Sequence, residues 1–311
     1  METSVTLLLE HVPCDLCGSE DVRLLYRKPD DWLRTSLYEF DVVQCRQCGL
    51  VYVDPRPTAE TMKRFYPAQY YEERGGPDYI RRYEAQVRTL PDLNGRRVLD
   101  IGCARGDFLH FLEQRYPRME GVGVDPFASS TVPGRFQFIQ SFVENAHFPP
   151  ASFDVVMAWA VIEHLPSPSQ CFAEVRRILK PGGLFTFLVT NERSLHDRWA
   201  LLEDVPRHLY HFSPKTVRRY AERFGFEVQR ILFTDDIFDG RGRGAITRLL
   251  ERWVGVTWAE RFRGPTRPVV RWIRRLGGYA DRIVFSTHWE SRLGISGIMV
   301  VQWRRLGKET P

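Results

Sequence analysis

The stretch Val98-Leu-Asp-Ile-Gly-Cys-Ala-Arg-Gly106 decides the fold, because it joins an apolar run to two glycines and then to a helical pattern. Its apolar first half predicts a β-strand, and the glycines after it predict a turn. Phe108, Phe111 and Leu112 then follow at the i, i+3, i+4 spacing of an α-helix. Strand, glycine turn and helix in this order are typical of nucleotide sites in open α/β sheets.

Two acids stand beside this turn. Asp100 closes the first strand, and Asp125 ends a second strand, Gly121-Val-Gly-Val124, at the position where doubly wound folds bind ribose hydroxyls. A pyrophosphate loop would have a glycine where Ala104 stands, and an acid would repel the phosphates. An acid instead favours a cationic ligand, and S-adenosylmethionine carries an ammonium and a sulfonium but no phosphate. The loop therefore predicts a positively charged nucleoside cofactor.

The chain after this loop alternates between apolar runs and amphipathic helical patterns. We expect strands at 153–162, 184–189 and 226–233. Between them, Cys171, Val175 and Ile178 share one helix face, and Ser213-Pro214 starts a further helix. Alternating strands and helices imply an α/β fold with a Rossmann-like, mostly parallel sheet and helices on both faces.

Two CxxC pairs stand near the start of the chain, and each is followed by a glycine. Their members are Cys14, Cys17, Cys45 and Cys48. Four thiolates can close a tetrahedral shell around Zn²⁺, and four protein ligands leave no open position for a substrate. We therefore expect a structural Zn²⁺ in an N-terminal zinc ribbon, the alternative being four thiols without metal.

Composition excludes several classes of protein. With 311 residues, 43% hydrophobic and 27% charged, the chain is long and apolar enough for a globular core. The longest apolar run, 155–162, is far shorter than the ~20 residues of a membrane span, and no secretory signal is expected. Six cysteines are too few for a disulfide framework, which favours a cytoplasmic location.

The net charge of +5 is unevenly distributed. Residues 1–56 carry six basic and ten acidic side chains, whereas residues 241–285 carry eleven arginines and three acids. A nucleic-acid partner for the ribbon is not expected, because phosphate contact needs basic side chains there. The segment 241–285 holds two basic amphipathic helices, which could rest on anionic lipid at the inner face of the membrane or bind a nucleotide sugar's diphosphate. The alternative is a helical cap with a solvated arginine face.

Five segments in order resemble the successive motifs of the class I S-adenosylmethionine-dependent methyltransferases. They are 98–106, 122–125, 152–156, 163–166 and 179–184. The resemblance covers roughly residues 90–235 and implies a closing strand near 297–303. The ribbon, with Cys48-Gly-Leu-Val-Tyr-Val-Asp-Pro55, is similar to that of sugar methyltransferases from surface-polysaccharide and antibiotic pathways.

The resemblance also implies roles for residues of the cofactor loop. Asp100, Gly102 and Gly106 would cradle the methionine part of S-adenosylmethionine, and Asp125 would hold the ribose. Phe142 stands where the family commonly has an acid near the adenine, so apolar packing and the Val143 backbone would replace that contact. The whole expected cofactor set is Asp100, Gly102, Cys103, Gly106, Asp125, Pro126, Phe142, Val143, Tyr70 and Tyr71.

Tyr70 and Tyr71 belong to a helical connector that carries many aromatic residues. In the resembled family this region folds over the cofactor, and an aromatic face would attract the sulfonium. The alternative is that both tyrosines only pack the connector.

Methyl transfer from a sulfonium is an in-line displacement, so a hydroxyl acceptor needs a proton acceptor beside it. Histidine is the natural acceptor near neutral pH. We rank His208 first, because it lies in a loop rich in His, Trp and charge, residues 191–212, and we keep His211 and His164 as candidates. The alternative for each is a hydrogen-bonded loop histidine without a chemical role.

Together these features predict five segments. They are a zinc ribbon at 1–57, a helical connector and cofactor lid at 58–94, a Rossmann-like domain at 95–240, a basic helical insertion at 241–285, and closing strands with a tail at 286–311. The expected activity is O-methylation of a sugar, a nucleotide sugar or a lipid-linked glycan, as in polysaccharide biosynthesis. The alternatives are an RNA methyltransferase that binds RNA through the ribbon, and a non-catalytic partner subunit that binds the cofactor.

Overall fold

The computed structural model describes residues 7–67, 77–128, 132–234, 236–237, 244–263 and 267–307. The chain divides into two compact units. The first, here called the ribbon unit, comprises Met1–Gly75, Asn191–Ser213 and Gly240–Gly297. The second, the sheet unit, comprises Gly76–Thr190, Pro214–Asp239 and Ile298–Pro311.

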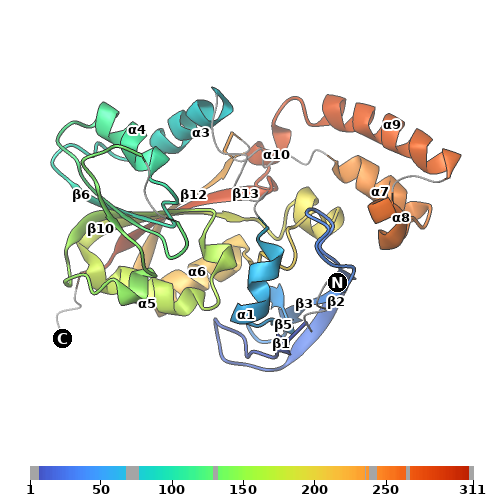
Figure 1. Cartoon of the computed structure of the whole chain (residues 1–311), viewed down its shortest axis with the longest axis horizontal. Helices are drawn as coiled ribbons and strands as arrows, with labels where there is room; N and C mark the ends of the chain where they lie inside the picture. The colour runs from blue at the N-terminus through green and yellow to red at the C-terminus, as the bar shows by residue number, and fades with distance from the viewer. Residues whose placement is uncertain are drawn as a thin grey trace, which may run out of the picture. The chain divides into compact units, whose positions relative to one another are not determined.

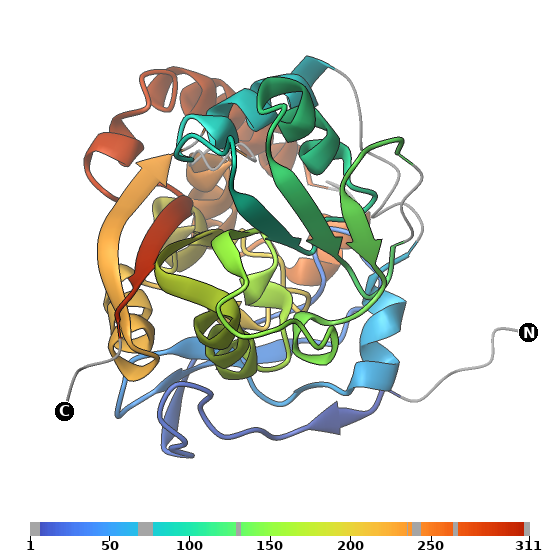
Figure 2. The same ribbon diagram turned by 90° about the vertical axis from the view of Figure 1, so that its left-hand side faces the viewer.

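The sheet unit is built on a seven-stranded sheet with the order β12-β13-β10-β9-β6-β7-β8. Its strands are β6 (Arg97–Ile101), β7 (Glu120–Val124), β8 (Gln137–Ile139), β9 (Phe153–Trp159), β10 (Leu179–Thr190), β12 (Phe226–Thr234) and β13 (Ile298–Arg305). The strands from β10 to β8 run parallel, and β13 is antiparallel to both β10 and β12 (Figure 2). The mostly parallel sheet and the closing strand are therefore confirmed.

Helices cover both faces of this sheet, as expected. They are α3 (Pro77–Val87), α4 (Asp107–Arg115), α5 (Pro168–Ile178) and α6 (Pro214–Arg223), with short 3-10 turns η2 (Val143–Asn145) and η3 (Ile162–His164). Figure 1 shows α3 and α4 on one side of the strands and α5 and α6 on the other. The central strands β6, β7 and β9 are buried between these layers, which is why they are apolar along most of their length, whereas the edge strands β8 and β12 are mostly half-buried or exposed and carry polar residues.

Two strand boundaries differ from the sequence expectation. The strand expected at 153–162 ends at Trp159, because Ala160 adopts a left-handed conformation with φ 54° and the chain then turns into η3. The strand expected at 184–189 begins earlier, at Leu179. Its register beside β9 is interrupted between Leu179 and Leu184, at the Pro181-Gly-Gly183 turn.

The ribbon unit holds two small antiparallel sheets. One pairs β1 (Leu9–Glu10) with β5 (Arg56–Pro57), and the other has the order β11-β4-β3-β2. Its strands are β2 (Val22–Lys28), β3 (Phe40–Cys45), β4 (Val51–Val53) and β11 (Tyr210–His211). Phe40, Val42, Val51, Val53 and Phe65 form its small core. The distant segment 191–213, expected as a loop, therefore adds a strand to the ribbon sheet.

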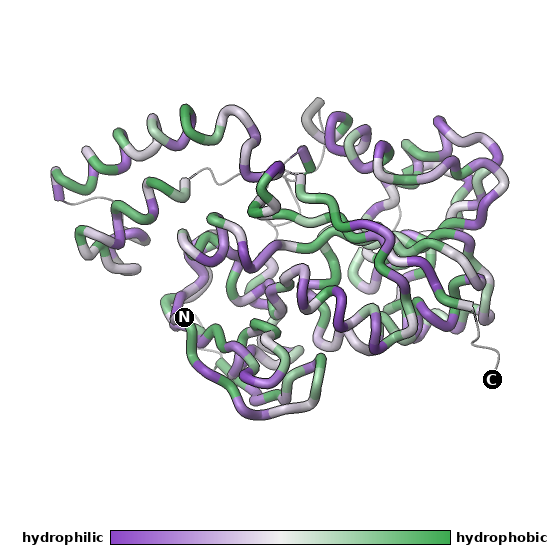
Figure 3. The backbone as a smooth tube through the Cα atoms, turned by 180° about the vertical axis from the view of Figure 1, so that it is seen from behind, coloured by the Kyte–Doolittle hydropathy of each residue, from purple (hydrophilic) through white to green (hydrophobic). Residues whose placement is uncertain are grey.

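Helices and helical turns complete the ribbon unit. They are α1 (Ala59–Met62), the 3-10 turn η1 (Lys63–Phe65), the π-helical turn η4 (Leu195–Trp199), α7 (Ala245–Trp253), α8 (Trp258–Arg263), α9 (Pro268–Val284) and α10 (Trp289–Arg292). The two helices expected in the basic insertion correspond to α7 and α9, which lie side by side (Figure 1). Hydrophobic and hydrophilic stretches follow one another within the turns of α9 (Figure 3).

Glycine and one buried acid explain the close packing of α7 and α9. A Cβ at Gly277 would lie 2.6 Å from Thr247 Oγ1, so only glycine allows this approach. Asp281 of α9 accepts hydrogen bonds from the backbone nitrogens of Ile246 and Thr247 at 2.9 and 3.2 Å, in the first turn of α7. The carboxylate thereby satisfies amides that a helix N-terminus leaves without an intrahelical partner.

Among these described helices, none combines the length and the apolar character that crossing a bilayer requires.

Candidate functional site

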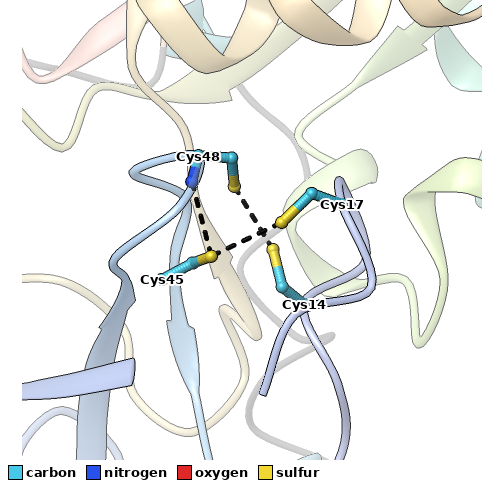
Figure 4. A group of neighbouring side chains, drawn as sticks. All are labelled: Cys14, Cys17, Cys45 and Cys48. Atoms are coloured by element: carbon cyan, nitrogen blue, oxygen red, sulfur yellow. Dashed lines mark hydrogen bonds between the residues drawn. The ribbon is translucent and has the colours of Figure 1, made fainter. Parts of the chain in front are cut away.

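The four predicted metal ligands meet in the ribbon unit. The sulfurs of Cys14, Cys17, Cys45 and Cys48 point toward one another from two turns (Figure 4), and all lie within 4.8 Å of one another. The Cys14 and Cys48 sulfurs are 3.4 Å apart, and those of Cys17 and Cys45 are 3.5 Å apart. A tetrahedron of sulfurs about 2.3 Å from Zn²⁺ has edges of about 3.8 Å, so the cluster fits the ion with small adjustments.

The turns that carry these thiols depend on glycine. Gly18 and Gly49 have φ values of 75° and 84°, and each donates its N–H to the carbonyl of the first cysteine of its pair. Contact with Cys14 lowers the pKa of the Cys48 thiol to about 5, so one of the four groups readily supplies a thiolate. Residues 14, 17, 45 and 48 would hold Zn²⁺ as a closed, structural site.

The predicted cofactor loop lies between β6 and α4 in the sheet unit. Asp100 is buried at the end of β6, and burial followed by the charge of Asp125 raises the pKa of Asp100 well above its usual range. A bound cation would favour the charged form of this carboxyl and oppose both effects. The donor set therefore suits the ammonium of S-adenosylmethionine better than a phosphate.

Both loop glycines are required by their surroundings. A Cβ at Gly102 would lie 2.4 Å from Val161 Cγ2, and one at Gly106 would lie 2.3 Å from Phe136 Cζ. Their φ values of 70° and 92° also fall in the left-handed region. The two glycines thus let the side chains of Val161 and Phe136 pack directly against the loop backbone.

Asp125 closes the loop from the neighbouring strand. Its Oδ2 accepts a hydrogen bond from the Ala104 backbone nitrogen at 3.0 Å, and its Oδ1 accepts from Phe127 and Ala128 at 2.9 Å each. The half-buried carboxylate is therefore oriented by three backbone N–H groups. Oδ1 already accepts two of these bonds, so a ribose hydroxyl can donate to the second lone pair of Oδ2.

Two aromatic rings stand beside Asp125. Phe142 is 38% exposed and Phe127 is 71% exposed, and their rings meet edge to face with centroids 5.8 Å apart. The Val143 side chain is buried, which leaves only its backbone for a ligand, and Pro126 is half-buried. Sequence reasoning missed Phe127, although an aromatic residue two positions after Asp125 was a usable signal.

Three further residues were expected to contact the cofactor: Cys103, Tyr70 and Tyr71. Cys103 is buried, and burial together with the charge of Asp100 raises the pKa of its thiol, so this side chain stays neutral. Tyr70 and Tyr71 lie outside the described residues.

His208, the first-ranked base, lies in the ribbon unit and is held by an acid. Its Nδ1 lies 2.9 Å from Glu203 Oε1, and the side chains of His208 and Glu203 are 14% and 1% exposed. Burial alone would raise the pKa of Glu203, but His208 outweighs it and holds that pKa below its ordinary value. When Nδ1–H donates to a carboxylate, Nε2 carries the lone pair, which is the arrangement of a general base.

His211 forms a second, deeper histidine–carboxylate pair. Its Nδ1 lies 3.1 Å from Asp197 Oδ2, and Tyr26 donates its hydroxyl to Asp197 Oδ1 at 3.3 Å. Burial alone would lower the pKa of His211, but Asp197 raises it above its ordinary value. The imidazole is fully buried, so His211 is placed to orient this network rather than to meet a substrate.

His164 lies in η3 of the sheet unit and is half-buried. It is the last residue of this turn, which follows β9, and the preceding residue, Glu163, is buried. His208 and His211 belong to the ribbon unit instead.

A buried ion pair fixes the loop that carries His208. Arg207 is fully buried and donates to Asp30 Oδ1 and Oδ2 at 2.7 and 3.0 Å and to the Phe65 carbonyl at 2.9 Å. Lys28, also buried, donates to the carbonyls of Leu201 and Glu203 at 2.9 and 2.5 Å. The ribbon thus positions both sides of the Glu203–His208 pair.

A cleft of about 210 Å³ lies in the ribbon unit near this network. Its lining contains three arginines, two buried acids, a glutamine and a half-buried tyrosine beside apolar residues: Arg23, Leu25, Tyr26, Gln44, Val51, Glu192, Asp197, Arg198, Leu201 and Arg252. Sequence reasoning named none of these as ligand-binding residues. They come from segments that are far apart in the chain, and only the fold brings them together.

A family model described as a methyltransferase domain matches residues 71–231. The match includes Asp100, Asp125 and His208 and leaves the four clustered cysteines outside. Among solved structures, a SAM-dependent methyltransferase from Archaeoglobus fulgidus is 22% identical with a TM-score of 0.49, covering 77% of this chain and 100% of that one.

Curated relatives agree with this match. The chain is 28% identical over 171 residues to a protein of Mycolicibacterium smegmatis named as a probable S-adenosylmethionine-dependent methyltransferase, covering 53% of this chain and 64% of that protein. It is 30% identical over 126 residues to a ubiquinone biosynthesis O-methyltransferase of Bradyrhizobium, covering 36% and 46%. It is 33% identical over 171 residues to a tRNA U34 carboxymethyltransferase of Pseudoalteromonas translucida, covering 46% and 49%. The chain spans about half to two thirds of the length of these relatives.

Proposed function

Because this chain belongs to the methyltransferase-domain family, we propose that it transfers a methyl group from S-adenosylmethionine to an oxygen of a sugar, a nucleotide sugar or a lipid-linked glycan. The observation that carries the oxygen acceptor is the His208 imidazole held at Nδ1 by the buried Glu203 carboxylate. A neutral hydroxyl is a weak nucleophile until a base removes its proton. The Glu203–His208 pair supplies such a base, because the carboxylate fixes the tautomer of the imidazole.

The chemistry asks little of the protein beyond orientation and proton removal. When bound, S-adenosylmethionine supplies a methyl carbon that its sulfonium activates. Asp100 would hold the ammonium and Asp125 the ribose hydroxyls, while Phe127 and Phe142 offer an apolar surface to the adenine. His208 Nε2 would take the proton of the acceptor hydroxyl as the new carbon–oxygen bond forms and the carbon–sulfur bond breaks. Glu203 would stabilise the imidazolium that results.

The cleft of the ribbon unit supports an acceptor rich in hydroxyls and carrying an anionic group. Arg23, Arg198 and Arg252 supply positive charge, and Gln44 with Glu192 supplies amide and carboxylate groups that bind hydroxyls. A nucleotide sugar or a lipid-linked glycan combines a diphosphate with a sugar, so we propose these two classes first.

RNA is the second candidate acceptor. One relative is named as a tRNA U34 carboxymethyltransferase, which favours this reading. The ten acids and six basic residues of segment 1–56 count against it, because RNA binding through the ribbon needs Lys and Arg there. Retention of tRNA that falls steeply with salt would support RNA, and no retention at low salt would exclude it.

We also propose the organisation and location that accompany this activity. The segments are the zinc ribbon at 1–57, the connector at 58–94, the cofactor domain at 95–240, the insertion at 241–285 and the closing strand with its tail at 286–311. Zn²⁺ would hold the ribbon, and the reaction would take place in the cytoplasm, with the insertion in peripheral contact with the membrane.

The decisive experiment separates cofactor binding from turnover. Calorimetric titration of the zinc-loaded protein with S-adenosylmethionine and S-adenosylhomocysteine is expected to show micromolar binding. Asp125→Ala should weaken binding by about tenfold or more, since it removes the ribose contact (about 1.4 kcal/mol). No binding to the unaltered protein would contradict the proposed cofactor site.

Turnover is then measured by transfer of a labelled methyl group to nucleotide sugars and lipid-linked glycans. His208→Gln should lose about 100-fold or more in rate while its cofactor affinity stays within about twofold, as expected for a general base. His110→Gln, a half-buried histidine on α4 that contacts Gln114, is the matched control. Unchanged turnover in His208→Gln would remove this residue as the base.

A further inference from the structure

Helix α9 leaves an apolar stripe uncovered. Five large apolar side chains on it are between 48 and 68% exposed: Val269, Trp272, Leu276, Tyr279 and Ile283. Their spacing of three and four residues places them on one face of the helix. A face of this size is unusual on a surface that meets only water, and it marks an interaction site.

The neighbouring helix α7 extends the apolar surface. Leu249 is 40% exposed and Trp253 is 84% exposed, whereas its buried side faces α9 and the rest of the ribbon unit. Tryptophan and tyrosine are the side chains that favour a boundary between water and hydrocarbon, because each has an apolar ring and a polar tip.

Charge on the same two helices is entirely basic where it is exposed. In residues 245–253 and 268–284, all within the described chain, the acids are Glu251 and Asp281, and both are buried. Glu251 contacts Arg274 at 2.6 Å, and Asp281 caps α7. The exposed charged residues are Arg252, Arg271, Arg275 and Arg282.

The arginines of α9 form a row along one edge of the stripe. Arg271, Arg275 and Arg282 each precede a stripe residue, which places them ~100° around the helix. Residues on the opposite edge, Val270 and Gly277, are buried toward α7. The helix therefore has a packed face, an apolar exposed face and a basic face in that order.

We propose that α7 and α9 form a docking surface for an anionic lipid bilayer. The axis of α9 would lie parallel to the membrane, with the apolar stripe at the boundary of the acyl chains and the arginine row among the headgroup phosphates. The long arginine side chains can reach the headgroups while their methylene stems remain on the apolar side.

An anionic bilayer accounts for both the apolar stripe and the arginine row, whereas a second copy of this chain or an RNA accounts for only one of them. Two copies of this chain that met through the stripe would bring two arginine rows together without compensating acids. RNA would neutralise the arginines but would leave Val269, Leu276 and Ile283 in water. Anionic lipid pairs with the arginines and takes up the apolar side chains at the same time.

Vesicle binding tests the proposal with the full-length, zinc-loaded protein. It should sediment with vesicles of phosphatidylcholine containing 30 mol% phosphatidylglycerol, and binding should fall as salt rises. Its affinity for vesicles of phosphatidylcholine alone should be lower by roughly tenfold or more. This proposal makes specific the membrane contact included in the proposed function. Because the readout is sedimentation rather than methyl transfer, it and the proposed methyl transfer can fail separately.

Matched variants locate the surface. Arg271→Gln with Arg275→Gln should lower the affinity for anionic vesicles roughly tenfold or more, whereas Arg218→Gln with Arg230→Gln, two exposed arginines of the sheet unit, should not. Leu276→Ser should also lower it several-fold, whereas Leu37→Ser, at 56% exposed against 59% for Leu276, should leave it unchanged. All six substituted residues are exposed, so the unfolding temperatures of the four variants should stay close to that of the unaltered protein.

Four results would overturn the proposal. They are no binding to anionic vesicles, equal binding to neutral vesicles, equal losses in the control variants, and a self-associated species in sedimentation velocity that Leu276→Ser dissolves. The last would assign the stripe to a second copy. Retention of tRNA lost in the double arginine variant, without vesicle binding, would assign the surface to RNA.

Discussion

At the scale of single residues, backbone conformation constrains the cofactor loop more tightly than side-chain chemistry does. Gly106 combines a φ of 92° with the ring of Phe136 at 2.3 Å from where a Cβ would stand. Gly182, in the turn within β10, has a φ of 76° and nothing within 4 Å of that position. Both glycines therefore have a left-handed backbone, but only Gly106 also lacks space for a Cβ.

We predict that Gly106→Ala destabilises the sheet unit by about 2–4 kcal/mol, because a left-handed alanine costs roughly 1 kcal/mol and the clash with Phe136 adds the rest. Gly182→Ala should cost only about 1 kcal/mol. Denaturant unfolding measures both values, and titration should show that Gly106→Ala alone loses cofactor affinity. Equal destabilisation by the two substitutions would mean that Phe136 moves aside and that contact is unimportant.

At the scale of elements, the sequence predicted those strands and turns that an apolar run, a glycine turn or a cysteine spacing marks. Apolar runs and glycine turns predicted β6, β9, β10 and β12, and cysteine spacing predicted the four-sulfur cluster. Strand β11 was not predicted, because Tyr210 and His211 carry no pattern of their own and pair with β4 only through the fold. Glu203 and Asp197 were also missed, since an acid in a polar loop is ordinarily solvated.

The pairing of Arg207 with Asp30 links the loop before β11 to the segment after β2, and its contribution to stability should depend on pH. Burial alone would raise the pKa of Asp30, but Arg207 and the Thr35 hydroxyl outweigh it and hold that pKa below its ordinary value. A carboxyl with a lowered folded pKa stabilises the protein above its unfolded pKa of about 3.9. That contribution is lost as the pH falls through the folded pKa.

We therefore predict that Asp30→Asn destabilises the ribbon unit by about 1.5–3 kcal/mol at pH 7, because the buried Arg207 keeps its partner Asp204 but loses its charge-assisted hydrogen bonds to Asp30. The difference from the unaltered protein should shrink as the pH falls below about 4. Asp41→Asn, which breaks an exposed pair with Arg27 at 2.7 Å, is the control and should cost less than about 1 kcal/mol. If the difference in free energy of unfolding between Asp30→Asn and the unaltered protein stayed constant down to pH 2, the lowered pKa of Asp30 would be contradicted.

At the scale of the whole molecule, the chain is not organised in the order of its sequence. The ribbon unit gathers three separate segments, and the base candidate His208 shares it with the four cysteines. The sheet unit contains the cofactor loop. Sequence patterns cannot show this grouping, because it rests on contacts between distant residues, such as Tyr26 with Asp197 and Arg207 with Asp30. Such pairs leave no periodic signal in either partner.

This grouping predicts that metal removal separates turnover from cofactor binding. Structural zinc contributes folding energy directly, so a chelator should unfold the ribbon around Cys14, Cys17, Cys45 and Cys48 and release the Glu203–His208 pair with it. Methyl transfer should then be lost, while the affinity for S-adenosylhomocysteine should change by less than about threefold, because Asp100 and Asp125 belong to the sheet unit.

Zinc content, far-ultraviolet circular dichroism and calorimetric titration on the same sample measure these effects together. Cys17→Ser should reproduce the chelated state, and Cys171→Ala, a buried thiol of the sheet unit, should keep its zinc. Re-addition of Zn²⁺ should restore turnover to the chelated protein but not to Cys17→Ser. If cofactor affinity instead fell in step with zinc loss, the cofactor loop would depend on the ribbon for its structure, and the two units would not fold independently.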